Sequence, residues 1–147
     1  MNAQSYPRSE MLNIIAESKL AFMTSGLGNI YDAAQFDLPT IWLPPTNDSQ
    51  GQQLQMISAK NMVDAHLDWG DIDYKEPQEI VIDRIIKHVH ALGSKALNTE
   101  MGECYREIKK SPHSRSHKLI EEFGTGGDAA VAKHVRAFLQ KIEGRSQ

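Results

Sequence analysis

The sequence predicts an α/β fold, a three-layer sandwich in which helices cover both faces of a short parallel sheet. Two apolar runs, Leu20–Met23 and Thr40–Leu43, flank a segment with helical spacing, and each run ends in a turn of small or polar residues. The second run is continuously apolar, as expected for a strand that is covered on both faces. Strands that alternate with helices in this way are typical of a parallel sheet packed between helices.

The N-terminal part is predicted to contain a helix, a strand and a second helix. Ser9 is a suitable N-cap for a helix over residues 10–17. A strand is expected over residues 19–24 and a helix over 28–36. The first helix is expected to place three apolar side chains on one face, Met11, Ile14 and Ile15.

A second strand, a long helix and a third strand are predicted next. Pro39 opens the second strand, a position where proline is tolerated. The helix is expected over residues 49–63 and the short strand over 66–69, followed by an acidic loop over 70–76.

The C-terminal part reads as helical. Pro77 suits a helix start, and apolar residues recur at three and four until Gly93 ends the pattern. A further helix is expected over residues 95–110, ending at the break 111–114. The segment 124–127 precedes a last amphipathic helix, whose apolar stripe comprises Val131, Val135, Phe138, Leu139 and Ile142.

Three strands are fewer than the usual six of a doubly wound nucleotide-binding domain. We therefore interpret residues 1–93 as the second half of such a Rossmann-like domain, and residues 94–147 as a helical extension that packs on it or on a partner.

Composition limits the class of protein. The 147 residues suffice for one core, and no apolar run is long enough to span a bilayer. The N-terminus has no signal-peptide pattern, and the lone Cys104 fits a reducing compartment, so we expect a cytoplasmic protein. Residues 1–103 carry a net charge of −7 and residues 104–147 a charge of +4. Because acidic residues are dispersed through the basic end, we expect a solvated surface there and no nucleic-acid partner.

The order of elements over residues 10–92 resembles the C-terminal, nucleotide-sugar-binding domain of GT-B glycosyltransferases. The nearest types are the N-acetylglucosaminyltransferase of peptidoglycan synthesis and the UDP-glucuronosyl and UDP-glucosyl transferases. The resemblance rests on a strand followed by Ser-Gly, an acidic residue six positions later, a strand-opening proline, and a Pro-rich loop with Asp and Gln. Here these are Ser25-Gly26, Asp32, Pro39, Pro44-Pro45, Asp48 and Gln50 or Gln52-Gln53.

The resemblance implies that the chain binds a nucleotide-sugar donor, a UDP-sugar, and needs no metal or other cofactor. Amides of the turn after the first strand can cradle a diphosphate, and Gly26 and Gly28 are expected to allow close approach and positive φ. Asp32, expected to be exposed, would accept hydrogen bonds from the ribose hydroxyls. The polar loop would contact the sugar. The predicted substrate-binding residues are Ser25, Gly26, Leu27, Gly28, Asn29, Asp32, Asn47, Asp48, Gln50, Gln52 and Gln53.

The sequence also departs from the family. Thr24 stands where many relatives have His, Asp32 replaces Glu, and Ser49 interrupts the Asp-Gln pair. The acceptor-binding N-terminal domain, which usually supplies the base, has no counterpart. We therefore expect the chain to be inactive alone and identify no catalytic residue.

Alternatives remain open for these residues. The Ser25–Gly28 turn is also consistent with a tight strand-to-helix connection without a ligand, Asp32 with a surface carboxylate, and the glutamines with an exposed polar face. The acidic set Asp64, Asp68, Asp71, Asp73 and Glu76 lacks the pattern of a calcium loop and reads as a solvated loop. No metal site is expected.

The first functional hypothesis is therefore the donor-binding part of a glycosyltransferase, either a fragment of such an enzyme or a subunit completed by a partner chain that supplies the N-terminal GT-B domain. The alternative is a non-catalytic nucleotide-binding or protein-interaction module derived from that fold; half of a nucleotide-sugar epimerase is a weaker third. Because the first strand lacks a neighbour on one side, we also expect self-association, as a homodimer, or cover by the C-terminal helices.

Overall fold

The computed structural model describes residues 4–70, 76–111, 113–126, 133, 135 and 136. Three parallel strands, β1 (Ala21–Thr24), β2 (Thr40–Leu43) and β3 (Ala65–His66), form a sheet in the order β1-β2-β3. The described residues also form five α-helices and a short 3-10 helix, η1. The helices are α1 (Arg8–Glu17), α2 (Leu27–Gln35), α3 (Asp48–Ala59), α4 (Gln78–Ile108) and α5 (Lys118–Phe123), and η1 spans Arg115–His117. The predicted α/β class with a short parallel sheet is confirmed, whereas its assignment to half of a doubly wound domain stays a prediction.

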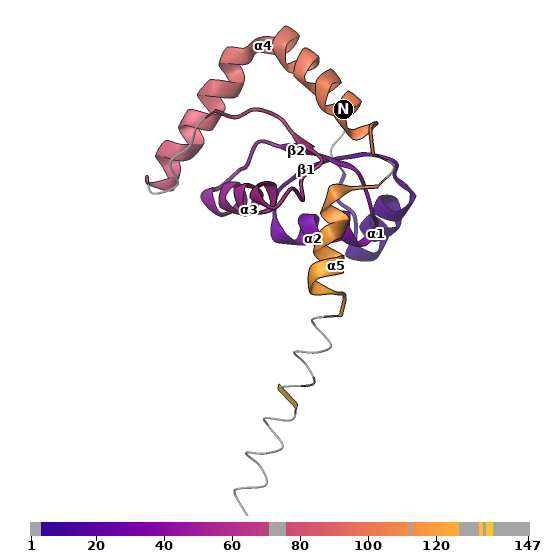
Figure 1. The fold of residues 1–147 in the computed structure, drawn as a ribbon. Helices are drawn as coiled ribbons and strands as arrows, with labels where there is room; N and C mark the ends of the chain where they lie inside the picture. Colours follow the sequence, from indigo (N-terminus) through magenta and orange to yellow (C-terminus); the bar gives the residue numbers. More distant parts are fainter. Residues whose placement is uncertain (1–3, 71–75, 112, 127–132, 134, 137–147) are drawn as a thin grey trace, which may run out of the picture.

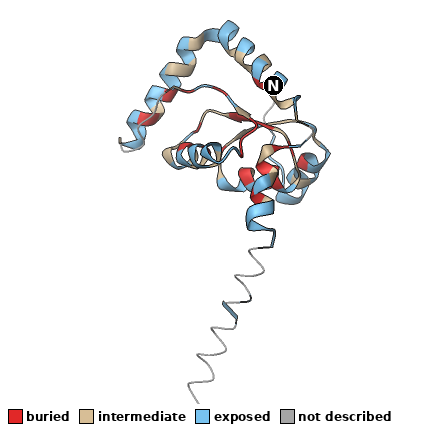
Figure 2. Cartoon of the chain, in the orientation of Figure 1, coloured by how far each residue is buried: buried red, intermediate tan, exposed pale blue. Residues whose placement is uncertain are grey.

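Helices cover both faces of the sheet (Figure 1). The register pairs Met23 with Trp42 and Phe22 with Ile41, so each pair shares a face. Trp42 packs into the larger core with α2, α3, the first half of α4 and α5; this core includes Ile30, Ala33, Leu54, Val81, Ile85 and Leu119. On the opposite face Ile41 packs against the second half of α4 around Cys104. Burial is concentrated along β2, between the two layers (Figure 2).

The start of α1 differs from the prediction. The helix begins at Arg8 directly after Pro7, and no side chain caps it, so Ser9 lies inside the helix and is not its N-cap. Proline fits this position because it has no N–H to satisfy. Met11, Ile14 and Ile15 share a face of this helix, as their spacing predicts, but Ile15 is buried whereas Met11 and Ile14 are exposed. The reason is position: α1 lies at the outer side of α2 and covers little of the core (Figure 1).

The helix after β2 is shorter than predicted. It ends at Ala59, and Asn61 takes a left-handed conformation with φ of 55°. Asparagine tolerates this conformation, which closes the helix and turns Met62 and Val63 into the core. The third strand is Ala65–His66 rather than 66–69, although the Leu67 N–H still donates to Trp42 O over 3.0 Å.

Gly93 divides α4 at the place where the sequence predicted a helix end. Its φ of 70° and ψ of 163° are accessible only to glycine, and the helix axis changes direction there (Figure 1). The first half of α4 joins the larger core, and the second half crosses the opposite face of the sheet.

The described helices include none with the length and apolar character that crossing a membrane requires. Most of the predicted last helix lies outside the described residues. Val135 alone of its apolar stripe is described, and it is exposed.

Candidate functional site

The two predicted loops lie side by side at the carboxyl ends of β1 and β2. Ser25 follows β1 and is fully buried, and its hydroxyl donates to the backbone carbonyl of Gln50 over 2.9 Å. This bond joins the turn after β1 to the first turn of α3. The parallel pairing of β1 with β2 places both turns at the same edge of the sheet, as predicted.

The N-terminus of α2 offers unpaired backbone donors. Gly26 is its N-cap residue, and no side chain caps the helix. The N–H of Gly26 donates to Thr24 O and that of Ile30 to Gly26 O. Within the described residues, the amides between them, those of Leu27, Gly28 and Asn29, have no acceptor. Three free N–H groups at the positive end of a helix dipole suit an anion.

Gln50 extends this set of donors. Its side-chain oxygen accepts from the Thr46 N–H over 2.8 Å and from the Thr46 hydroxyl over 3.0 Å, which fixes the orientation of the amide. Its Nε2 therefore faces the other way, 3.9 Å from where a Cβ on Gly26 would lie. No acceptor for this NH₂ group is present in the described part of the chain.

The prediction of positive φ at the two glycines of this turn is wrong. Gly26 has a φ of −67°, and Gly28 is not among the glycines with positive φ. A Cβ on Gly28 would meet nothing within 4 Å. Neither the backbone conformation nor the packing therefore requires glycine at position 28, although glycine in a helix costs about 0.5–1 kcal/mol relative to alanine. A Cβ at position 28 would lie in open space.

The other polar residues of the second loop divide between structural roles and exposure. Asn47 caps α3, because its side-chain oxygen accepts from the Gln50 N–H over 2.9 Å and from the Ser49 hydroxyl over 2.8 Å. Asp48 accepts from the Ser49 N–H. Gln52 is exposed, and Gln53 is half-buried with its Oε1 shielded from solvent and unbonded in the described region.

Asp32 does not fit its predicted exposure. Its exposed fraction is 4%, and both carboxylate oxygens accept from the Arg8 guanidinium over 2.5 and 2.6 Å. The Asp32 pair also raises the pKa of Arg8. The prediction failed because the partner comes from α1, 24 residues earlier. Asp32 thus ties α1 to α2, and a role in ribose binding would require it to leave or share this pair.

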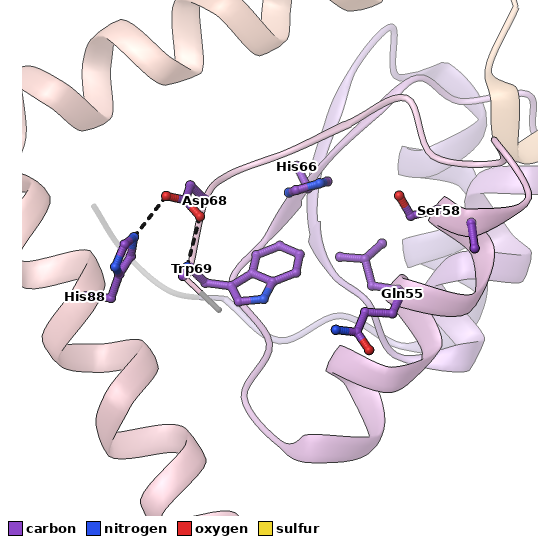
Figure 3. Close-up of a pocket in the computed structure, with 9 residues that line it drawn as sticks. Gln55, Ser58, His66, Asp68, Trp69 and His88 are labelled. Carbon is purple, nitrogen blue, oxygen red and sulfur yellow. Dashed lines mark hydrogen bonds and ion pairs between the residues drawn. The ribbon is translucent and has the colours of Figure 1, made fainter. Parts of the chain in front are cut away.

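A second polar cluster lies beyond β3. A pocket of about 740 Å³ between α3 and α4 is lined by His66, Asp68, Trp69 and His88, with Gln55 and Ser58 on its α3 wall (Figure 3). His88 Nε2 lies 3.0 Å from Asp68 Oδ2, and the rings of His66 and Trp69 have centroids 4.7 Å apart. None of the predicted donor-site residues lines this pocket.

The geometry of this cluster explains why residue 70 is a glycine and why the pKa of the Asp68 carboxyl is lowered. The Gly70 N–H donates to Asp68 over 2.9 Å, which lowers the pKa of the Asp68 carboxyl, and the His88 contact adds to the effect. Gly70 has a φ of 81°, and a Cβ there would lie 3.0 Å from the His88 ring. The sequence carried no signal for this pair, because its members are 20 residues apart.

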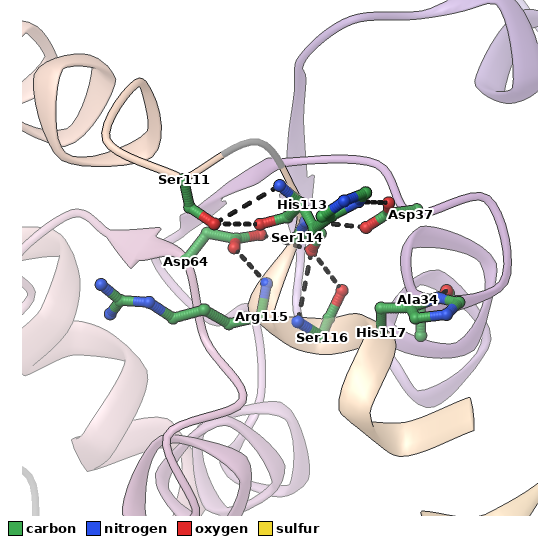
Figure 4. A network of polar contacts seen from close by, with 9 residues as sticks. All are labelled: Ala34, Asp37, Asp64, Ser111, His113, Ser114, Arg115, Ser116 and His117. Atoms are coloured by element: carbon green, nitrogen blue, oxygen red, sulfur yellow. Dashed lines mark hydrogen bonds and ion pairs between the residues drawn. The ribbon is translucent and has the colours of Figure 1, made fainter. Parts of the chain in front are cut away.

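Asp64 is the center of a buried network at the opposite, amino end of the sheet (Figure 4). Its carboxylate accepts from the Thr40 N–H over 3.1 Å, from the Ser114 hydroxyl over 2.7 Å and from the Arg115 N–H over 2.6 Å. Asp37 accepts from the Ser114 N–H over 2.7 Å. The two carboxylates thereby hold the start of η1 against the sheet.

The interpretation of the acidic residues as one solvated loop is therefore wrong for Asp64 and incomplete for Asp68. Asp71 and Asp73 lie outside the described residues. Among the residues that the structure describes, no group of three or more His, Cys, Asp or Glu side chains is placed to hold a metal ion. Burial raises the pKa of the Cys104 thiol, which is the opposite of what a nucleophilic thiolate needs.

Comparisons with protein-family models, with curated protein sequences and with solved structures each find no match to this chain. The candidate site therefore rests on its geometry and chemistry alone.

Proposed function

We propose that this chain is the donor-binding part of a glycosyltransferase and that it binds the diphosphate of a UDP-sugar at the N-terminus of α2. The observation that carries the proposal is the set of donors left free there: the amides of Leu27, Gly28 and Asn29 and the Nε2 of Gln50. These groups come from the turn after β1 and from the first turn of α3, which the Ser25–Gln50 hydrogen bond connects. They therefore lie close together at the carboxyl edge of the sheet.

The proposal also explains why residue 28 is a glycine. An alanine would fit the helix and would stabilise it, yet the middle one of the three residues with free amides is a glycine. A diphosphate that approaches the backbone closely needs the space that a glycine leaves. Oriented N–H groups stabilise the charge of a departing diphosphate without a metal ion, which is the demand of glycosyl transfer from a nucleotide donor.

In this proposal a partner chain supplies the acceptor-binding domain, and the chain by itself binds the donor without turning it over. Sugar transfer after addition of that partner distinguishes half of an enzyme from a non-catalytic nucleotide-binding module.

The test is a titration with uridine diphosphate, followed by NMR, with uridine as the comparison ligand. We expect uridine diphosphate to shift the amides of Leu27, Gly28 and Asn29 and the side-chain NH₂ of Gln50. Uridine lacks the phosphates and should leave these signals in place. If millimolar uridine diphosphate leaves them unmoved, the proposal fails.

A charge change at Gln50 sharpens the test. Gln50→Glu keeps an oxygen for Thr46 but turns a second oxygen toward the α2 N-terminus, where it repels an anion. Gln55→Glu makes the same charge change at an exposed position of α3 and serves as the control. We expect the first variant to lose roughly tenfold or more in affinity, about 1.4 kcal/mol, and the second to bind like the wild type.

A further inference from the structure

The pocket between α3 and α4 is rich in hydrogen-bond acceptors. Three titratable side chains line it, those of His66, Asp68 and His88, together with the indole of Trp69. Figure 3 shows this indole between Asp68 on one side and Gln55 of α3 on the other. None of these residues belongs to the proposed diphosphate site, so the pocket is a separate place on the molecule.

The hydrogen bonds of the two histidines fix which ring nitrogens accept. His66 Nδ1 donates to the Leu67 carbonyl over 3.2 Å, because a carbonyl oxygen can only accept. His88 Nε2 likewise donates to the Asp68 carboxylate over 3.0 Å. In the neutral rings, His66 Nε2 and His88 Nδ1 are then acceptors, and the described residues provide no donor for either. A Cβ on Gly70 would lie 3.0 Å from His88 Nδ1, so the glycine leaves this nitrogen uncovered.

The Asp68 carboxylate adds a negative charge to these acceptors. It accepts from the Gly70 N–H at Oδ1 and from the His88 ring at Oδ2, and each oxygen keeps a further lone pair. The bond from Gly70 lowers the pKa of this carboxyl, which keeps it ionised at neutral pH. Within the described residues, the lining contains no lysine or arginine that could neutralise it. The pocket therefore suits a cation that carries hydrogen-bond donors.

We infer that this pocket binds a guanidinium group, which stacks on Trp69 and donates hydrogen bonds to Asp68. A substituted guanidinium is planar, carries five N–H donors in a fixed fork and stacks on aromatic faces. An ammonium is a compact point charge, which suits acceptors that converge on one point. The acceptors here do not converge, since in the described part of the chain no three such side chains are placed to hold one metal ion. The inference does not depend on the proposed function.

The test titrates millimolar ethylguanidinium chloride into the full chain at constant ionic strength and follows the tryptophan indole N–H signals by NMR. Ethylurea is the matched ligand, because it is planar and of similar shape but uncharged. Trp69 lines the pocket, whereas Trp42 is fully buried in the larger core and serves as the internal control. We expect ethylguanidinium to shift the Trp69 signal saturably and the Trp42 signal much less, and ethylurea to shift neither.

Two carboxylates of nearly equal exposure locate the charge that binds. The Asp68 side chain is 61% exposed, and that of Asp83, which pairs with Lys87 within α4, is 59% exposed. Asp83 does not line the pocket. Asp68→Asn should weaken ethylguanidinium binding roughly three- to fivefold, and Asp83→Asn should leave it unchanged.

An arginine side chain and a free guanidino compound present the same group to the pocket. The peptide Gly-Gly-Arg-Gly-Gly, with Gly-Gly-Lys-Gly-Gly as its control, distinguishes these two sources. An arginine peptide that binds more tightly than ethylguanidinium assigns the pocket to an arginine of a partner chain, and one that binds no more tightly assigns it to a free compound. A lysine peptide that binds as well as the arginine peptide contradicts the preference for a guanidinium.

A gain of affinity separates binding from a loss of structure. Gln55→Glu adds a carboxylate to the α3 wall of the pocket and should tighten ethylguanidinium binding roughly threefold. Gln52→Glu adds the same charge at an exposed position of α3 outside the lining and should not. Equal Trp69 shifts with ethylguanidinium and ethylurea, unchanged affinity in Asp68→Asn, or no gain in Gln55→Glu would overturn the inference.

Discussion

Asp32 is the residue at which the structure changes the expected chemistry most. A carboxylate six positions after the Ser-Gly turn was predicted to face solvent, but it is buried against α1 and paired with Arg8. If the buried Asp32 carboxylate is made neutral, the Arg8 guanidinium loses the ion pair that it forms in the folded chain.

Asp32→Asn should therefore lower the free energy of unfolding by about 1–2 kcal/mol. Chemical denaturation measures this, and Glu10→Gln, an exposed carboxylate on α1, is the control that should change it little. An unchanged midpoint in Asp32→Asn would mean that the Arg8 contact contributes nothing to stability.

Asp68 makes stability depend on pH. Its carboxyl has a lowered pKa in the folded chain, chiefly because it accepts a hydrogen bond from the Gly70 N–H. A group whose pKa is depressed on folding contributes stability above its unfolded pKa, and that contribution disappears as the pH falls through the folded pKa.

Denaturation curves between neutral and acidic pH should thus show a larger loss of stability for the wild type than for Asp68→Asn. The difference should be small, because the Asp68 side chain is 61% exposed. The expectation is contradicted if the two proteins lose stability in parallel over the whole acid range.

At the scale of elements, α4 depends on one glycine. Gly93 has φ and ψ of 70° and 163°, a combination that side chains with a Cβ adopt only under strain. It lets one half of α4 reach the larger core and the other half cross the opposite face of the sheet.

Gly93→Ala should destabilise the chain by about 1–3 kcal/mol, because the alanine either strains the backbone or straightens the helix. Gly102→Ala lies in the regular second half of α4, where a Cβ makes only an ordinary contact of 3.5 Å with Arg106. Calorimetric melting of both variants should show a lower stability for Gly93→Ala and a higher stability for Gly102→Ala. A stabilised Gly93→Ala would show that the kink is not required.

Several elements were predictable because their signals are local. The apolar run around Trp42, the turns at Ser25 and Pro44, and the helix end at Gly93 each follow from neighbouring residues. The rest depended on contacts between distant parts of the chain. Asp32 is paired with Arg8, and Asp64 accepts hydrogen bonds from Ser114 and Arg115, which lie 50 and 51 positions later in the chain. The burial of these two carboxylates could therefore not be predicted from the spacing of residues in the sequence. The free Nε2 of Gln50 likewise depends on the position of Thr46 in the folded loop.

For the molecule as a whole, the outer edge of β1 has no neighbouring strand among the described residues. The Ala21 N–H donates to the Pro39 carbonyl, on the side of β1 that faces β2. Because successive residues of a strand direct their backbone groups to opposite sides, the N–H and C=O of Phe22 face the open edge. The Phe22 side chain is 46% exposed. An apolar strand with an open edge is a template for pairing with another strand.

We expect the full chain to self-associate through this edge, with a mass by light scattering that rises with concentration. Phe22→Lys places a charge at the edge and should shift the protein toward the monomer. Met56→Lys adds the same charge at an exposed position of α3 and should not. A wild type that stays monomeric at high concentration would contradict this expectation.

The most direct test of the central claim, a diphosphate site at the α2 N-terminus, is a calorimetric titration of Gly28→Ala with uridine diphosphate. A Cβ at position 28 meets no protein atom within 4 Å, so the variant should fold and gain about 0.5–1 kcal/mol of stability. A methyl group on the middle one of the three residues with free amides reduces the space for a diphosphate bound there, and affinity should fall roughly tenfold or more. Gly102→Ala should gain stability and bind like the wild type. Wild-type affinity in Gly28→Ala would contradict the account.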